Sequence, residues 1–319
     1  MKVGVVIPAH NAECFIAGTL ASLQRQSYPN WQAVVVDDGS HDRTAELVRQ
    51  AAAGDARLRL VAQENRGAAA ARDRGFDELG SSCDGVLFFD HDDRLRPDAL
   101  ARLSATLSDS PNACAAYGLA ATVDAGGRLI RRGKLGRQRC RRKLEGRRLV
   151  AMRVEEPMTF AGLVVRNWIP VGGILIRSEA KRAAGAFDAA IGHAHDWDMW
   201  LRLSLLAPIA FLNEVVYDYR VHATGMSHDP GEILRSELLV REKLVMQADL
   251  PVEIRRQALI ATRLVLRAQL RRQVLKSAGL ALRLRATEGR ERLATARANF
   301  LRFAALDPCA PAASHDSPP

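Results

Sequence analysis

Four continuous apolar runs, separated by stretches with helical spacing, dominate the first hundred residues. The runs are VGVVIPA (3–9), QAVVVDD (32–38), LRLVAQ (58–63) and GVLFFD (85–90), and the helical stretches cover about 13–26, 43–53 and 67–79, with a further helix after Pro97 and Asp98. Strands that lack polar alternation and are separated by helices of about 10 to 15 residues are typical of parallel βαβ units covered on both faces. The pattern therefore predicts an α/β fold with a mostly parallel central sheet flanked by helices.

Beyond residue 110 the pattern changes twice. Residues 111–228 contain a Gly-Gly pair and an arginine-rich stretch, and regular strand and helix patterns return from about residue 156. Residues 229–306 are almost purely helical in pattern, whereas the tail at 307–319 is small, polar and rich in proline, a composition typical of disorder. We therefore expect two halves of one domain, 1–110 and 111–228, followed by a C-terminal helical extension and a disordered tail.

The net charge of +10 is concentrated in two regions. Residues 1–100 carry 11 Lys and Arg against 15 Asp and Glu, a net of −4, whereas 128–148 carry 11 against one Glu, a net of +10, and 231–319 carry 16 against 9, a net of +7. Such asymmetry indicates an anionic partner. Nucleic acid is disfavoured, because no aromatic residue lies between Arg128 and Val150 to stack on bases. Since so many cations cannot be buried without partners, we expect the basic loop at 128–148 to be exposed.

The sequence favours a cytoplasmic protein. Its five cysteines lie far apart and form no C-x-x-C pair, which is typical of free thiols in a reducing compartment. The apolar core of the N-terminus, Val3 to Ile7, is too short for a signal peptide. No window approaches the roughly 18 consecutive apolar residues that a membrane span needs.

Polar residues gather where three of the predicted strands end. Pro8-Ala9-His10-Asn11 follows the first run, Asp37-Asp38-Gly39-Ser40 the second, and Asp90-His91-Asp92-Asp93 the fourth. Ligands bind at the carboxyl ends of the strands in open parallel sheets. Clustered carboxylates repel one another unless a cation lies among them, and oxygen ligands of this kind favour Mg²⁺ or Mn²⁺ with phosphate oxygens of a substrate. The alternative is that single residues such as Asp38 and Asp93 only cap turns and helices.

Other nucleotide-binding and hydrolase classes lack their motifs here. A dinucleotide-binding fold needs G-x-G-x-x-G after the first strand, yet Pro8 to Glu13 contains no glycine. The chain also has no G-x-x-x-x-G-K-[ST] loop and no G-x-S-x-G nucleophile turn.

The motifs occur in a characteristic order. VGVVIPAHNAECFIAGTLASLQRQSYPNWQAVVVDDGSHDRTAELV is followed by ENRGAAAARDRGF and GVLFFDHDDRLRPDAL, and then by GGILIRSEAKRAAGAFD (172–188), HDWDMWLRL (195–203) and YRVHATGMS (219–227). This series resembles the family 2 glycosyltransferases of the GT-A fold, over nearly all of residues 1–105 and only loosely over 110–170. The resemblance implies that 1–110 is the nucleotide-sugar-binding half and 111–228 the acceptor-binding and catalytic half.

The same resemblance implies an activity and its substrates. A sugar would be moved, with inversion and metal assistance, from a nucleotide-diphosphate sugar to an acceptor hydroxyl. A UDP-sugar is the expected donor, and the acceptor would be a sugar or a lipid-linked molecule of cell-envelope or polysaccharide biosynthesis.

Single residues gain roles by this resemblance. The nucleotide sugar would be bound by Pro8, His10, Asn11, Asp38, Arg72 and Asp90. The divalent cation, Mn²⁺ or Mg²⁺, would be bound by Asp92, with Asp93 and His222 as further candidates. Asp196 would be the catalytic base that takes the proton of the acceptor hydroxyl. The position before it departs from the family pattern, because His195 stands where relatives have Glu.

Several alternatives stay open. The chain could be a non-catalytic module that binds an anionic polymer or a membrane through 128–148, or a nucleotidyltransferase, which the missing glycine-rich loop disfavours. HAHDWD could be a His-x-His metal site, and Trp197 and Trp200 could be a sugar platform instead of core residues.

The basic regions suggest attachment to the inner face of a membrane. Between 251 and 278, apolar residues at Ile254, Ala258, Ala261, Val265 and Ala268 form one helical face that arginines flank, so this helix could lie on an anionic membrane or pack on the domain. The basic loop at 128–148 is expected to recruit an anionic acceptor or the membrane that carries it.

Overall fold

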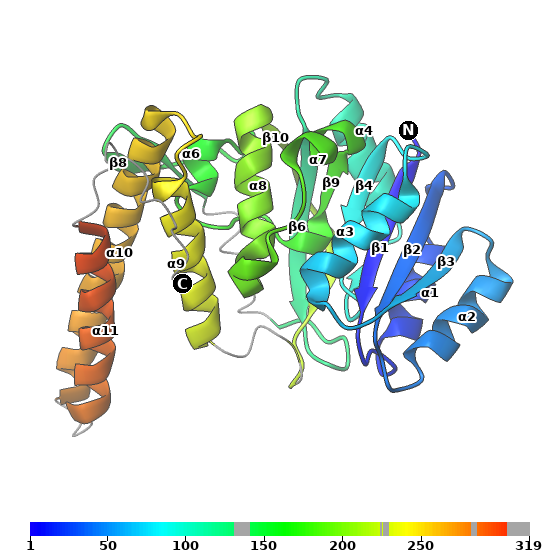
Figure 1. Ribbon diagram of the computed structural model, residues 1–319, viewed down its shortest axis with the longest axis horizontal. Helices are drawn as coiled ribbons and strands as arrows, with labels where there is room; N and C mark the ends of the chain where they lie inside the picture. The colour runs from blue at the N-terminus through cyan, green and yellow to red at the C-terminus, as the bar shows by residue number, and fades with distance from the viewer. Residues whose placement is uncertain (131–140, 224, 226–229, 282–285, 305–319) are drawn as a thin grey trace, which may run out of the picture.

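The computed structural model describes residues 1–130, 141–223, 225, 230–281 and 286–304, and an eight-stranded mixed sheet lies at its centre (Figure 1). The strand order is β3-β2-β1-β4-β9-β6-β10-β5. Its strands are β1 (Val3–Ala9), β2 (Trp31–Asp38), β3 (Leu58–Gln63), β4 (Gly85–Phe88), β5 (Arg94–Leu95), β6 (Ala115–Val123), β9 (Ile174–Arg177) and β10 (Ile209–Arg220). The strands β1 to β4 are parallel as predicted, whereas β9 and β5 run antiparallel to their neighbours.

Helices cover both faces of this sheet. They are α1 (Ile16–Gln24), α2 (Thr44–Gly54), α3 (Gly67–Leu79), α4 (Ala99–Ser108), α6 (Phe160–Leu163), α7 (Ser178–Ala184), α8 (His195–Leu206), α9 (Pro230–Met246), α10 (Val252–Ala281) and α11 (Ala286–Ala304), with short 3-10 helices at Val171–Gly173 and Ala189–Ala194. Alternate residues of a strand point to opposite faces. Val6 of β1 accordingly joins the core beneath α3 and α8, while Val5 and Ile7 join the core beneath α1 and α4. Both faces of β1 are buried in apolar cores, which explains why this strand shows no polar alternation.

The C-terminal helices form a layer at one end of the sheet (Figure 1). Ala258 and Ala261 of α10 are fully buried, and Ile254 and Val265 pack against the same core as α8. The packing interpretation is therefore confirmed for this part of the apolar face, whereas Ala268 is exposed. Within the described residues, none of the helices combines the length and the apolar character needed to cross a membrane.

The described part of the basic stretch differs from the expected exposed loop. Residues 131–140 lie outside the described residues, as does the tail at 307–319, but β7 (Arg142–Glu145) and β8 (Arg148–Ala151) form an antiparallel hairpin. Arg141, just before this hairpin, is buried. Its guanidinium donates to the Tyr117 hydroxyl at 2.6 Å and to the backbone carbonyls of Arg153, Val154 and Glu156, and it stacks 3.9 Å from the ring centre of Phe211. A buried cation is tolerated here because neutral acceptors surround it.

Candidate functional site

The ends of β1 and β2 form one polar corner. Nδ1 of His10 donates to the backbone carbonyl of Asp38 at 2.9 Å, and the backbone N–H of Asn11 donates to the Ser40 hydroxyl at 3.0 Å. Asn11 has a positive φ of 48°, a conformation that Asn tolerates better than most residues. The carbonyl of Pro8 accepts a hydrogen bond from Nδ1 of His91 at 3.1 Å. The structure thus brings Pro8, His10 and Asn11 beside Asp38, as the sequence predicted.

The Asp38 carboxylate is buried at the start of α3. It accepts hydrogen bonds of 2.8 Å from the side chain of Gln63 and from the backbone N–H groups of Arg66 and Gly67. Gly39 makes the turn after it, with φ of 74°, and a Cβ there would lie 2.9 Å from the backbone nitrogen of Asn65. Asp38 therefore has the role of a cap that the sequence left open as an alternative. A carboxylate has about four acceptor positions, so Asp38 can accept a further hydrogen bond from a ligand.

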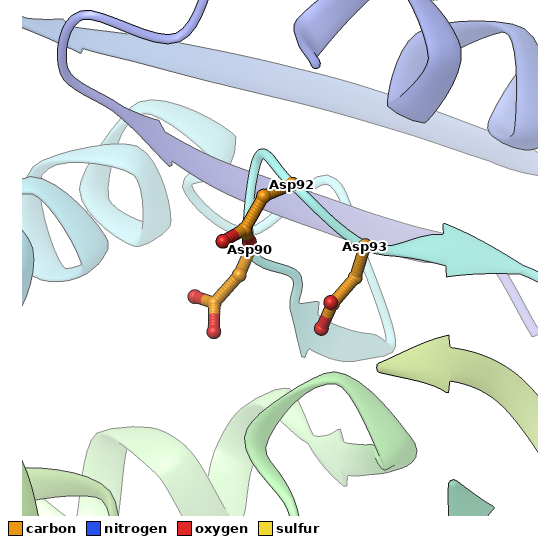
Figure 2. A group of neighbouring side chains, drawn as sticks. All are labelled: Asp90, Asp92 and Asp93. Atoms are coloured by element: carbon orange, nitrogen blue, oxygen red, sulfur yellow. The ribbon is translucent and has the colours of Figure 1, made fainter. Parts of the chain in front are cut away.

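Asp90, Asp92 and Asp93 form a compact acidic group after β4. One carboxylate oxygen from each lies within 4.8 Å of the other two, and the three side chains project to the same side of the loop (Figure 2). Nε2 of His222 lies 2.8 Å from Oδ2 of Asp92, and the backbone N–H of Arg220 donates to Oδ1 of Asp93 at 2.8 Å. Arg220 is the last residue of β10, and His222 follows two residues later. Three hard oxygen donors at this spacing fit a Mg²⁺ or Mn²⁺ ion.

Arg72, in helix α3, extends its side chain toward Asp90 of the acidic group. Its side chain is 3% exposed, and Nη2 donates to Oδ1 of Asp90 at 2.6 Å. Nη1 contacts Nε2 of His195, the first residue of α8. Burial and the neighbouring guanidinium lower the pKa of His195 to about 4, so this imidazole is neutral at pH 7.

Asp196 follows directly in the first turn of α8. Its Oδ1 accepts from the backbone N–H of Trp197 at 2.6 Å, and Oδ2 accepts from the side chain of Asn167 at 3.0 Å. Burial raises the pKa of Asp196, against the opposing effects of Arg72 and these two hydrogen bonds. A carboxylate with a raised pKa is a stronger base, which suits proton removal from a hydroxyl.

A cavity of about 520 Å³ joins these groups. Arg72, Asp90 and Asp196 line it, together with Trp168 and Tyr217. The other predicted site residues lie outside its wall, at the strand ends described above: Pro8, His10, Asn11, Asp38, Asp92, Asp93 and His222. The structure therefore places the predicted site residues in two adjoining regions, the strand ends with the acidic group after β4 and the cavity that contains Asp196, and Asp90 belongs to both.

Three charged or amide side chains of the cavity are absent from the predicted site residues. Arg166 and Asn167 lie in the segment between α6 and β9, and Glu237 comes from α9. The first two fall where the resemblance was loose, so no motif marked them. Helical spacing places Glu237 one turn after Ile233, which also lines the cavity, but spacing alone does not tell which surface that face meets.

Burial and the spacing of ligand atoms bear on two of the open alternatives. Trp197 and Trp200 are both buried in the core, which favours the core interpretation. The Trp197 indole donates to the Leu163 carbonyl at 2.9 Å, and only Trp197 of the two also lines the cavity. Among the described residues, the group of His, Cys, Asp and Glu close enough to hold a metal consists of the three aspartates after β4, without His193 or His195.

Comparison with known proteins shows a similarity to glycosyltransferases. Residues 4–157 match the model for "Glycosyl transferase family 2". The chain is 36% identical over 99 residues to TuaG of Bacillus subtilis, covering 31% of this chain and 38% of TuaG. It is 28% identical over 226 residues to a chondroitin synthase of Escherichia coli, covering 70% of this chain and 30% of the synthase. The chain thus spans less than two fifths of the length of these curated relatives.

Solved structures agree on the fold. TarS residues 1–349 of S. aureus, in complex with UDP-GlcNAc, superpose with a TM-score of 0.64 at 20% identity, covering 95% of this chain and 81% of that one. A mannosyltransferase from Pyrobaculum calidifontis, in complex with GDP-Man and Mn²⁺, gives a TM-score of 0.61 at 20% identity, covering 95% and 86%. The chain has the GT-A fold of these glycosyltransferases, and nearly half of it, residues 4–157, matches the model for glycosyl transferase family 2.

Proposed function

We propose that this protein transfers a sugar from a nucleotide-diphosphate sugar to an acceptor hydroxyl, with inversion at the anomeric carbon and with metal assistance. The observation that carries the proposal is the cavity shared by Asp90 and Asp196, with Arg72 donating to Asp90 at 2.6 Å. One carboxylate belongs to the acidic group after β4, and the other has the raised pKa of a base. A donor and an acceptor held on these two sides would meet in the cavity.

The nucleotide would lie in the corner formed by the ends of β1 and β2. Asp38 would accept the imide N–H of a uracil, while Pro8, His10 and Asn11 would contact the base and ribose through backbone and side-chain groups. Complexes of TarS with UDP and UDP-GlcNAc support a UDP-sugar as donor. Arg72 would face the diphosphate or the sugar, because its guanidinium reaches the wall of the cavity beside Asp90.

Mn²⁺ or Mg²⁺ would be held by Asp92 with Asp90 or Asp93. The bound Mn²⁺ of the Pyrobaculum mannosyltransferase supports a divalent ion in this fold. Such an ion, when bound, neutralises negative charge on the departing diphosphate. Nε2 of His222 would orient Asp92, and the N–H of Arg220 holds Asp93 in place.

Asp196 would act as the base. The acceptor oxygen attacks the anomeric carbon, the bond from that carbon to the diphosphate oxygen breaks, and the hydroxyl proton passes to the Asp196 carboxylate. Hydrogen bonds from Asn167 and from the Trp197 backbone fix this carboxylate toward the cavity. A single displacement inverts the configuration of the sugar.

The acceptor would enter the cavity from the side of Arg166, Trp168 and Glu237. A sugar or lipid-linked acceptor of cell-envelope or polysaccharide biosynthesis is the partner we propose, since the chain resembles a chondroitin synthase over 226 residues. A cytoplasmic site of action at the inner membrane face belongs to the same proposal.

The test is a panel of UDP-, dTDP- and GDP-sugars with Mn²⁺, followed by detection of the released nucleotide and by NMR of the product anomer. We expect turnover with a UDP-sugar and an inverted product. A retained configuration would contradict the single displacement. Absence of binding by every sugar nucleotide would instead favour the alternative, a non-catalytic module that binds an anionic polymer or membrane.

A further inference from the structure

The guanidinium of Arg72 is held by acceptors of two different kinds. Nη2 donates to the charged Asp90, 2.6 Å away, whereas Nη1 meets the imidazole nitrogen Nε2 of His195. A buried guanidinium keeps its direction only where its N–H groups find acceptors. His195 is therefore the group that fixes the side of Arg72 away from Asp90.

His195 is itself fixed in the orientation and tautomer that this contact needs. Its Nδ1–H donates to the backbone carbonyl of Gly192, so Nε2 carries the lone pair that faces Arg72. Gly192 has φ of 70°, a conformation that favours glycine, and this turn directs its carbonyl to the ring. The Phe187 ring packs edge-to-face on His195, with ring centres 5.8 Å apart, and lies 5.9 Å from the Arg72 guanidinium.

We propose that His195 is a positioning residue that holds Arg72 against the donor diphosphate, and that it does so as a neutral acceptor. This inference rests on the proposed function, in which Arg72 faces the donor. A neutral imidazole suits this place because His195 begins α8, where the positive end of the helix dipole disfavours a cation.

Two substitutions separate the two hydrogen bonds of the ring. In His195→Gln the amide reaches the place of Nε2 and can accept from Arg72, whereas in His195→Asn the shorter amide reaches the place of Nδ1 and can donate to Gly192. Both remove the imidazole. Calorimetric titration with UDP and Mn²⁺ should therefore give a nearly unchanged Kd for His195→Gln and a Kd raised about tenfold for His195→Asn, since one hydrogen bond to a charged group is lost.

The Arg72→Lys background provides the second arm. A lysine has no planar guanidinium for Nε2 of residue 195 to fix. In the Arg72→Lys protein, His195→Gln and His195→Asn should therefore bind UDP with equal affinity. The losses of UDP affinity from substituting Arg72 and His195 should accordingly not add. Val48→Ala, in α2 on the opposite face of the sheet, is the control for lost stability, because it opens a core cavity without touching the site. Its Kd should match that of the parent protein.

NMR of ¹⁵N-labelled histidine provides a readout that does not depend on donor binding. We expect His195 at pH 7 to be neutral, with the proton on Nδ1. A protonated Nε2 would overturn the inference. Equal UDP Kd values for His195→Gln and His195→Asn in the protein that retains Arg72 would also overturn it. Failure of the unsubstituted protein to bind UDP with Mn²⁺ would count against the proposed function, while the NMR result would still decide the orientation of His195.

Discussion

Nη2 of Arg72 lies 2.6 Å from Oδ1 of Asp90, and this ion pair joins the helix α3 to the loop after β4. The guanidinium is almost fully buried, whereas the Asp90 side chain is 23% exposed. Separating the two groups would leave the buried Arg72 guanidinium without its counter-charge. We therefore expect a displacement of Asp90 to displace the Arg72 side chain as well. The acidic group after β4 and the cavity beside Asp196 are thereby coupled through one contact.

Replacing Asp196 by Asn should lower kcat by at least about 10²-fold, as is typical when a general base is removed. Asn keeps the shape of the side chain but cannot take up the proton of the acceptor hydroxyl. Affinity for UDP with Mn²⁺, measured by calorimetry, should stay within about threefold of the parent value. An equal loss of donor affinity would assign Asp196 a binding role instead.

The stability of the protein should fall as the pH drops from 6.5 toward 4. The folded-state pKa of His195 is lowered to about 4 from an ordinary value of 6.5, so in this interval the unfolded chain binds a proton that the folded chain does not. The difference corresponds to about 3 kcal/mol. Urea unfolding of the parent and of His195→Gln at pH 7 and pH 4 checks this, because the variant should lose less stability by about that amount. Parallel pH profiles of the two proteins would contradict the assignment.

Arg141→Met should destabilise the fold by about 3 kcal/mol, because it leaves the Tyr117 hydroxyl and neighbouring carbonyls without their donor. Arg142→Ser is the matched control. Arg142 is the next residue, exposed, and its substitution should change the free energy of unfolding by less than about 0.5 kcal/mol. Urea denaturation measures both, and similar values for the two variants would show that burial of Arg141 contributes nothing.

The basic hairpin should bind anionic membrane surfaces through its exposed arginines. Arg142, Arg147 and Arg148 are exposed, and each cation near an anionic lipid surface contributes about 1 kcal/mol. We expect the parent protein to co-sediment with phosphatidylserine vesicles at low salt and the triple Ser variant to do so less. Neutral phosphatidylcholine vesicles are the control. Binding that the substitutions leave unchanged would disprove a role for the hairpin in recruitment.

The parts of the site that follow directly from strand ends could be predicted from the sequence. Asp38 and Asp90 are the last residues of the runs QAVVVDD and GVLFFD, and topology then brings them to one edge of the sheet. For Trp197 the sequence left a core position and a sugar platform open, and burial in the structure favours the core. The positions of these two aspartates follow from the local pattern of the apolar run that each one ends.

Other features depend on packing between distant segments. The burial of Arg141 needs the hydroxyl of Tyr117, 24 residues earlier, and the contact between Arg72 and His195 joins positions 123 residues apart. No periodicity indicates such partners. Glu237 reaches the cavity only because α9 packs next to α8, which the helical pattern of the extension does not specify.

The most direct test of the central claim is calorimetric titration of the Mn²⁺-loaded protein with UDP-sugars, with Asp92→Ala in parallel. Asp92 lies in the acidic group after β4, so its loss should weaken donor binding through the metal while leaving the fold intact. We expect the parent protein to bind a UDP-sugar only when Mn²⁺ is present, and the variant to lose about tenfold or more in affinity, the effect typical of a residue that holds a metal. Absence of sugar-nucleotide binding by the parent protein, or equal affinity of the variant, would contradict metal-assisted glycosyl transfer at this site.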